Sequence, residues 1–298
     1  MTNTPLISVV IGTFNQIRVL ELVLDEYVNQ TLPASQFEVI VVDSSSTDGT
    51  SEFLMGYAPS YPFKAIIQPN TGKASARNRA VQEARGDIIL VTDADMIPHP
   101  SLLELHLSAH RKTSQSTCFE GTTMNMTELH WPVVQEKLYP YITRPYASGA
   151  KLGWYYFLTG NLSLPKSLFL QENGFDKVFI GYGWEDLELG YRLSLKKVPL
   201  FYLKEAINYH YHVVTQEEEI SRCEKKGESA KLFVEKHPEL ATFLGLNPLS
   251  KWVFKRIYPE GKVVAWIRQN CFERPTGWRH GFGFWFLKEY YYLCGILK

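Results

Sequence analysis

The sequence lacks the residues and runs that mark several classes of protein. Its four cysteines are far apart and form no C-x-x-C pair, which argues against a zinc site or a disulfide framework and for a reducing compartment. No apolar run approaches the roughly 18 residues of a membrane span. The first residues, MTNTPLISVVIGTFN, lack the basic region and long apolar core of a signal peptide. These absences predict a cytoplasmic protein.

An excess of charge of one sign is also missing. The chain has 31 Lys and Arg against 31 Asp and Glu, and its pI is near 7.1. Whole-protein nucleic-acid binders usually show a basic imbalance, so that class is disfavoured. The glycines form neither G-x-G-x-x-G nor the G-x-x-x-x-G-K-[ST] phosphate loop, which weakens a dinucleotide or P-loop interpretation. With 45% hydrophobic residues, the chain can still bury a sizeable core.

Four short apolar runs predict β-strands in the first hundred residues. They are LISVVIG, FEVIVVD, FKAIIQ and DIILVTD, at 6–12, 37–43, 63–68 and 87–93. Continuous rather than alternating hydrophobicity is typical of parallel strands buried on both faces. A stretch with helical periodicity (17–30) separates the first two runs, and a stretch rich in helix formers that ends at Gly86 separates the last two. This alternation predicts an α/β layered domain.

Polar or small residues follow each predicted strand, at the edge of the sheet where such folds bind ligands. These segments are 12–15, 43–49, 70–73 and 93–95. Asp93 and Asp95 are two residues apart at a strand end, so their carboxylates can share one side and bind Mg²⁺ or Mn²⁺; the alternative is a polar turn. Asp43 could bind a base or ribose, or could cap its own turn.

Basic residues and histidines supply further candidates, each with a simpler alternative. Lys73 and Arg77 lie where a predicted helix begins, so they could bind phosphate or be ordinary surface cations. His210 and His212 face the same side of a predicted strand, and one of them could complete a metal site; both could equally be ordinary histidines of an aromatic strand.

The stretch GYGWEDLELGYRL at 181–193 places Glu185 and Asp186 in the first turn of a predicted helix. Acids there are stabilised by the helix dipole, by about 0.3–1 kcal/mol. That effect does not account for the preceding loop, in which Gly181 and Gly183 alternate with aromatic residues. A glycine hinge with aromatic side chains suits a sugar-binding platform, so one of these acids is a candidate catalytic base.

The ordered motifs SVVIGTFN, VIVVDSSSTDGT, NTGKASARN, ILVTDADM, TGNLSLPKSLFLQENGFDKVFIGYGWEDLELGYRL and YHYH resemble those of the inverting glycosyltransferases of family 2. The resemblance covers about residues 5–215 and is greatest to the branch of galactosyl- and N-acetylgalactosaminyltransferases and chondroitin polymerases. It implies the GT-A fold, an α/β fold with a Rossmann-like, mostly parallel central sheet flanked by helices. Residues 1–215 would form the catalytic domain and 216–298 a helical extension.

The resemblance also implies a role for each matching residue. Asp186 would be the catalytic base, and Glu185 would contact the sugar and acceptor. Asp95 would bind the metal directly with His210, His212 being the less favoured histidine, and Asp93 would bind the metal or the ribose and sugar. The implied nucleotide-sugar site comprises Thr13, Phe14, Asn15, Asp43, Gly72, Arg77, Asp93, Ala94, Gly160, Asn161 and Trp184. The segment 172–177 departs from the family pattern of two glycines and an acid, which puts only acceptor details in doubt.

The implied activity is metal-dependent transfer of a hexose or N-acetylhexosamine from a UDP-sugar, with Mn²⁺ or Mg²⁺ as cofactor. The acceptor would be a hydroxyl of a glycan or of a lipid-linked acceptor in bacterial polysaccharide synthesis. Two alternatives are a sugar nucleotidyltransferase, which would need a basic phosphate-activating loop that GTFNQIRV lacks, and a non-catalytic carbohydrate-binding relative.

The last segment, 251–298, is aromatic and basic. Amphipathic docking on the inner face of an anionic membrane would suit it. A helical cap that packs on the catalytic domain, or on a partner in a homo-oligomer, would suit it equally.

Overall fold

The computed structural model describes residues 4–113, 116–129, 138–142, 145–212, 214–257, 261–273 and 277–298. The chain forms two compact units. The first comprises Met1–Lys177 and Glu185–Val213, and the second comprises Val178–Trp184 and Val214–Lys298. The sequence analysis placed one boundary, after residue 215; the short segment Val178–Trp184 was not expected to belong with the C-terminal residues.

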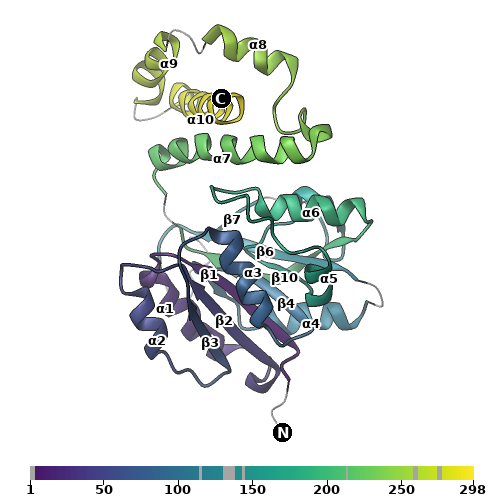
Figure 1. Cartoon of the computed structure of the whole chain (residues 1–298). Helices are drawn as coiled ribbons and strands as arrows, with labels where there is room; N and C mark the ends of the chain where they lie inside the picture. Colours follow the sequence, from purple (N-terminus) through teal and green to yellow (C-terminus); the bar gives the residue numbers. More distant parts are fainter. Residues whose placement is uncertain are drawn as a thin grey trace. The chain divides into compact units, whose positions relative to one another are not determined.

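One β-sheet forms the centre of the first unit (Figure 1). Its strands in chain order are β1 (Ile7–Thr13), β2 (Phe37–Asp43), β3 (Phe63–Ile67), β4 (Ile88–Asp93), β5 (Met96–Pro98), β6 (Cys118–Met126), β7 (Leu138–Pro140), β8 (Lys151–Leu152), β9 (Leu162–Pro165) and β10 (Leu200–His210). The order across the sheet is β3-β2-β1-β4-β9-β6-β10-β5, with β7 beside β6 and β8 beside β10. Strands β1 to β4 pair in parallel, as do β6 and β10, whereas β9 runs antiparallel to both β4 and β6.

Helices cover both faces of this sheet (Figure 1). They are α1 (Ile17–Glu26), α2 (Thr50–Gly56), α3 (Lys73–Glu83), α4 (Leu102–Arg111), α5 (Lys166–Gln171) and α6 (Glu185–Leu195). On β1, Val9 and Ile11 join the core that contains residues of α1 and α4, whereas Val10 joins the core that contains residues of α3 and α5. Because both faces are buried, every β1 and β2 residue is buried, and the predicted parallel α/β core is confirmed.

The stretch YYFLTGNLSL at 155–164 predicts one further strand, and this prediction is wrong in its first half. Trp154–Tyr156 form a 3-10 helix, in which the N–H of Phe157 donates to the carbonyl of Trp154, and β9 begins only at Leu162. The aromatic side chains of this turn contact another element instead: the ring of Trp154 meets the ring of Tyr191 in α6 edge to face, with the ring centres 5.2 Å apart. Tertiary packing therefore overrides the strand propensity of these aromatic residues.

The second unit is helical in most of its described part. It contains α7 (Gln216–Lys236), α8 (Pro248–Ile257), α9 (Lys262–Ile267), a π-helical turn (Arg268–Phe272) and α10 (Trp278–Leu297). Thr215 and Glu218 cap the start of α7 reciprocally. Gly227 of α7 and Gly295 of α10 let the two backbones meet, because a Cβ on Gly295 would lie 2.0 Å from the Glu224 carbonyl oxygen. No helix in the described part of the chain is long and apolar enough to cross a bilayer.

Candidate active site

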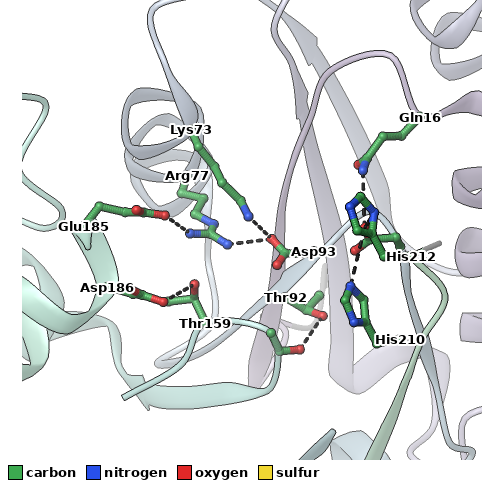
Figure 2. Close-up of polar contacts among 12 residues, drawn as sticks. Gln16, Lys73, Arg77, Thr92, Asp93, Thr159, Glu185, Asp186, His210 and His212 are labelled. Carbon is green, nitrogen blue, oxygen red and sulfur yellow. Dashed lines mark hydrogen bonds and ion pairs between the residues drawn. The ribbon is translucent and has the colours of Figure 1, made fainter. Parts of the chain in front are cut away.

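Five charged side chains gather at the carboxyl end of β4 (Figure 2). Lys73 and Arg77 come from the first turns of α3, Asp93 ends β4, and Glu185 and Asp186 begin α6. Parallel strands present their carboxyl ends at one edge of a sheet, so loops and helix starts that are far apart in the sequence converge there. The site was expected at this edge.

Arg77 joins the acids of α6 to the acid of β4. Its side chain is fully buried, and its guanidinium donates to Glu185 Oε1 at 2.9 Å and to Asp93 Oδ1 at 2.5 Å. Lys73 Nζ lies 2.7 Å from the same Asp93 oxygen, and the guanidinium lies 5.7 Å from the centre of the Phe175 ring. A buried cation needs such partners, because an unpaired charge away from water costs several kcal/mol. Arg77 therefore fixes the position of both carboxylates.

The electrostatics of this group keep Asp93 ionised. Burial raises the pKa of the Asp93 carboxyl, but the charges of Lys73 and Arg77 outweigh it and hold that pKa below its ordinary value. In Figure 2, Asp93 lies between the cations of α3 and the two histidines. Both cations contact the same oxygen of Asp93, Oδ1, so neither of these ion pairs uses the other carboxylate oxygen.

The pKa of Asp186 is shifted in the opposite direction to that of Asp93. Desolvation raises the pKa of its carboxyl to about 6, with a further contribution from the negative charge of Glu185, and Arg77 opposes the shift only in part. Asp186 Oδ1 accepts the N–H of Leu187 at 2.8 Å, and Thr159 Oγ1 lies 3.5 Å from the other oxygen. A carboxylate whose pKa is raised toward the working pH is a better general base than an ordinary one. The bond to the Leu187 N–H is one that any acid at a helix start can make, so it is the raised pKa that makes Asp186 a candidate general base.

The loop before Asp186 is held in the second unit. The indole N–H of Trp184 donates to the Lys226 carbonyl at 2.9 Å, and the Tyr182 ring lies under Arg222 and Lys226. Trp184 has a φ of 76°, a left-handed conformation that costs a bulky residue about 1–3 kcal/mol. This loop, which the sequence suggested as a free glycine-hinged flap, is thus anchored on α7, and its last residue immediately precedes Glu185.

Asp95, His210 and His212 form a compact cluster at the same sheet edge. Their candidate ligand atoms all lie within 4.8 Å of one another. His212 Nδ1 is 3.1 Å and His210 Nε2 is 3.7 Å from Asp95 Oδ2, and the two imidazole rings stack with their centres 5.6 Å apart. The structure brings together both histidines, including His212, which the sequence analysis ranked second.

The cluster fits a divalent cation. Asp95 Oδ1 is buried and has no hydrogen-bond partner, which is costly unless a ligand satisfies it. His210 Nδ1 lies 2.8 Å from the amide oxygen of Asn125. That oxygen can only accept, so Nδ1 carries the proton and the lone pair of Nε2 faces Asp95. Burial raises the pKa of the Asp95 carboxyl, yet the adjacent imidazoles of His210 and His212 hold that pKa well below its usual range, so the carboxylate is ionised.

The sequence analysis did not predict two residues that contact this cluster. Asn125 orients His210, and Gln16 donates to Asp95 Oδ2 at 3.4 Å. Asn125 occurs in the stretch GTTMNMT, which carries no motif, so the sequence alone gave no signal for it. Asp93 is absent from the cluster among the described residues, because its carboxylate is directed to Lys73 and Arg77.

The loops after β1 and β2 are tied together. The N–H of Asn15 donates to Ser46 Oγ at 2.8 Å, and Asn15 Oδ1 accepts the N–H of Thr47 at 2.8 Å. Asp43 is fully buried and accepts hydrogen bonds from Ser46 and Ser51, so in this state it caps its own turn.

Two residues where β1 leads into its loop remain candidates for contact with a ligand. Phe14 is 47% exposed, and Thr13 Oγ1 is buried with no hydrogen-bond partner. An unsatisfied buried hydroxyl is unfavourable unless a ligand or water satisfies it.

The remaining predicted residues differ in how they face the site. Gly72, with a φ of 93°, forms the N-cap of α3, and Ala94 is fully buried between the two aspartates. The Gly160 carbonyl accepts from Thr92 and Asn208, and a Cβ at Gly160 would lie 2.6 Å from Met96 Cε. Asn161 is directed into the core, where its amide nitrogen donates to two backbone carbonyls and its oxygen pairs with His106. These contacts favour a structural role for the Asn161 side chain.

Comparison with known proteins agrees with this geometry. Residues 8–169 match the family model described as glycosyl transferase family 2. The chain belongs to glycosyl transferase family 2. Residues 143–216 of this glycosyltransferase also match the model described as the N-terminal domain of galactosyltransferase.

Curated relatives of the glycosyltransferase act on several substrates. Validoxylamine A glucosyltransferase of Streptomyces hygroscopicus subsp. jinggangensis is 29% identical, with an alignment covering 90% of this chain and 70% of the relative. Chondroitin synthase of Pasteurella multocida is 26% identical over 78% of this chain, but this covers only 27% of the synthase. A second validoxylamine A glucosyltransferase is matched over 65% of its length.

Solved structures support the GT-A fold of the glycosyltransferase. The mannosyltransferase PcManGT from Pyrobaculum calidifontis, in complex with GDP-Man and Mn²⁺, gives a TM-score of 0.61 at 17% identity and covers 99% of this chain and 86% of its own. Residues 1–349 of S. aureus TarS in complex with UDP give a TM-score of 0.58 at 16% identity, covering 88% of this chain and 78% of TarS.

Proposed function

We propose that this glycosyltransferase transfers a hexose or N-acetylhexosamine from a UDP-sugar to a hydroxyl of a glycan or lipid-linked acceptor, by a single displacement with inversion at the anomeric carbon. Residues 1–215 would carry the reaction, with 216–298 as a helical extension. Among the bacterial relatives, chondroitin synthase supports a role in polysaccharide or glycoconjugate synthesis. Four free, buried cysteines agree with a reducing, cytoplasmic location.

The observation that carries the proposal is the contrast between two carboxylates near Arg77. Arg77 binds Asp93 directly, whereas Asp186 follows the Arg77-bound Glu185 in the chain. Asp93 is held ionised by the cations of α3, whereas the pKa of Asp186 is raised to about 6. Sites in which neighbouring carboxyls have such different pKa values often assign a charge-stabilising role to one and proton transfer to the other. We assign proton transfer to Asp186.

The chain's own residues then have separate tasks. Asp186 accepts the proton of the acceptor hydroxyl, which makes that oxygen nucleophilic. Arg77 keeps Glu185 beside Asp186, where Glu185 raises the pKa of the base and can hydrogen-bond the sugar or acceptor. Asp93 orients the ribose or sugar, and the loops around Thr13, Phe14 and Asn15 receive the nucleoside.

Asp95, His210 and His212 would hold the divalent cation. When bound there, the cation supplies Lewis-acid stabilisation of the charge that develops on the departing diphosphate. Two imidazoles and one carboxylate give a mixed nitrogen and oxygen donor set. Mg²⁺ prefers oxygen ligands, so this set favours Mn²⁺ over Mg²⁺. The Mn²⁺ named with PcManGT agrees with this choice.

Nucleotide binding tests the donor assignment. Calorimetric titration with UDP and with GDP, each in Mn²⁺ and in EDTA, should give tight binding of UDP only in Mn²⁺. Equal binding of both nucleotides would contradict the UDP-sugar assignment, and binding that is insensitive to EDTA would contradict the metal site. A nucleotidyltransferase would instead form a nucleotide sugar from a sugar phosphate and a nucleoside triphosphate. A non-catalytic carbohydrate-binding relative would catalyse neither this reaction nor sugar transfer.

The raised pKa of Asp186 predicts the pH dependence of transfer. The carboxylate must be ionised to accept a proton, so kcat/KM should rise with pH through a midpoint near 6 and then level off. If the base were an aspartate with an ordinary pKa, that midpoint would lie at about pH 4. The measurement is kcat/KM from pH 4 to 8 at saturating Mn²⁺, with Mn²⁺-dependent UDP binding followed over the same range. An acidic limb centred near pH 4, or one that coincides with loss of UDP binding, would contradict the assignment.

A further inference from the structure

Exposed tryptophans concentrate in the C-terminal helices. Four of the seven tryptophans lie in α8, α9 and α10, and their exposed fractions are 56% for Trp252, 60% for Trp266, 78% for Trp278 and 57% for Trp285. Single exposed apolar residues are common on protein surfaces, but a concentration of large aromatic ones marks an interaction surface. The sequence analysis left membrane docking and packing against protein open for this segment.

Helix α10 has two opposite faces. Gly283, Leu287 and Cys294 are buried, and α10 packs along α7 within the second unit. Trp278, Phe282 and Trp285 are spaced by four and three residues, which places them on one stripe roughly opposite the buried one. The inner face of α10 therefore accounts for its packing within the second unit, and its outer aromatic face is left exposed.

The two shorter helices repeat this arrangement. In α9, Val264 and Ile267 are buried whereas Val263 and Trp266 are exposed. In α8, Trp252 is exposed together with Leu249, which is 69% exposed. Both helices contact α10. The three helices thus expose aromatic and aliphatic side chains within one compact unit; we call these exposed residues of α8, α9 and α10 the tryptophan surface.

Positive charge accompanies the tryptophan surface. Over 248–257, 261–273 and 277–297, the exposed charged residues are two acids, Glu273 and Glu289, and five cations: Lys251, Lys255, Arg256, Lys262 and Arg279. Two of the cations lie over the aromatic rings, with Arg256 at 5.2 Å from the centre of the Trp252 ring and Arg279 at 5.5 Å from that of Trp278. The surface therefore combines tryptophan with a local excess of positive charge.

We propose that the tryptophan surface docks on an anionic lipid bilayer, with the tryptophans at the headgroup level and the cations against anionic headgroups. Tryptophan prefers that level because its ring is apolar and its N–H is polar. A second copy of the chain fits less well, since a symmetric dimer through this surface would place five cations against the same five cations. The docking is independent of the glycosyl-transfer reaction proposed above.

Vesicle co-sedimentation of the full chain tests this docking. Vesicles of phosphatidylglycerol and phosphatidylcholine should bind the protein, vesicles of phosphatidylcholine alone should bind it much more weakly, and salt should weaken the binding. Each cation close to an anionic surface contributes about fivefold to affinity, so Lys255→Glu/Arg256→Glu should lower the partition coefficient by more than about tenfold. Trp278→Ser/Trp285→Ser should lower it by at least about tenfold through loss of buried apolar area.

Matched controls separate docking from general effects. Met55, 71% exposed, and Val28, 54% exposed, lie in the first unit, so Val28→Ser/Met55→Ser removes similar exposed apolar area and should bind vesicles normally. Circular dichroism and Tm should show that all variants fold. Brominated lipids should quench the fluorescence of the wild-type protein and quench the Trp278→Ser/Trp285→Ser variant less.

Two results would overturn the proposal. One is equal binding of the wild-type protein and the Trp278→Ser/Trp285→Ser variant to anionic vesicles, or no binding by either. The other is dimerisation without lipid that the same variant abolishes, since that would assign the tryptophan surface to a second copy of the chain. Sedimentation velocity without vesicles measures the second result directly.

Discussion

Replacing Asp186 with asparagine should lower the rate of sugar transfer by about 10²–10⁴-fold, the usual contribution of a general base. Asparagine has nearly the same shape but cannot accept the hydroxyl proton. The UDP-binding residues and the Asp95, His210 and His212 cluster are unchanged, so the affinity for UDP in Mn²⁺ should stay close to that of the wild-type protein. Steady-state kinetics and a UDP titration on the same preparation measure both quantities.

The matched control is Glu188→Gln. Glu188 lies in the first turn of the same helix and is bound to Arg192 at 2.9 Å, outside the proposed site. Loss of this charge should lower stability while leaving kcat within a few-fold of the wild-type value. Full activity of the Asp186→Asn variant would show that Asp186 is not the base. A loss of activity in Glu188→Gln as large as that in Asp186→Asn would show that both acids only stabilise the start of the helix, and the assignment would again be wrong.

The Asp95→Ala variant should lose Mn²⁺-dependent binding of UDP. Removing the hydrogen-bond partner of a metal ligand lowers metal affinity by about 10–100-fold, so removing a ligand itself should lower Mn²⁺ affinity by at least about 100-fold. The buried Oδ1 of Asp95, which has no hydrogen-bond partner, identifies this carboxylate as the one whose loss matters most. Calorimetry with UDP in the presence of Mn²⁺, and electron paramagnetic resonance of free Mn²⁺, measure the loss.

Asp87→Ala is the control for this loss. Asp87 is exposed and lies just before β4, at the opposite end of the strand from Asp93. This variant should bind Mn²⁺ and UDP as the wild-type protein does. Tight, Mn²⁺-dependent UDP binding by the Asp95→Ala variant would contradict the metal role of Asp95.

The strands of the first unit were predictable because burial on both faces leaves a local signature. Each of β1, β2 and β4 appears in the sequence as a short run dominated by Val, Ile and Leu, and in the structure each begins and ends within one residue of the predicted run. The sheet edge at which the site lies followed from the same pattern. The metal and base residues came from motif resemblance at those strand ends.

What could not be predicted depends on contacts between distant residues. Arg77 and Glu185 are 108 residues apart, and His210 and Asn125 are 85 residues apart. No local pattern encodes that Arg77 would join Glu185 to Asp93, or that Asn125 would set the tautomer of His210. The loop 178–184 shows the same limit. Its glycines suggested a free hinge, but its aromatic side chains pack on α7, far along the chain.

Release of nucleoside diphosphate from a panel of UDP- and GDP-sugars, with acceptor mixtures and with Mn²⁺ or EDTA, tests the central claim most directly. The account predicts that a UDP-hexose or UDP-N-acetylhexosamine releases UDP in Mn²⁺, that EDTA abolishes the release, and that neither the Asp186→Asn nor the Asp95→Ala variant supports it. Release that persists in EDTA, or that the Asp186→Asn variant supports at the wild-type rate, would contradict the account.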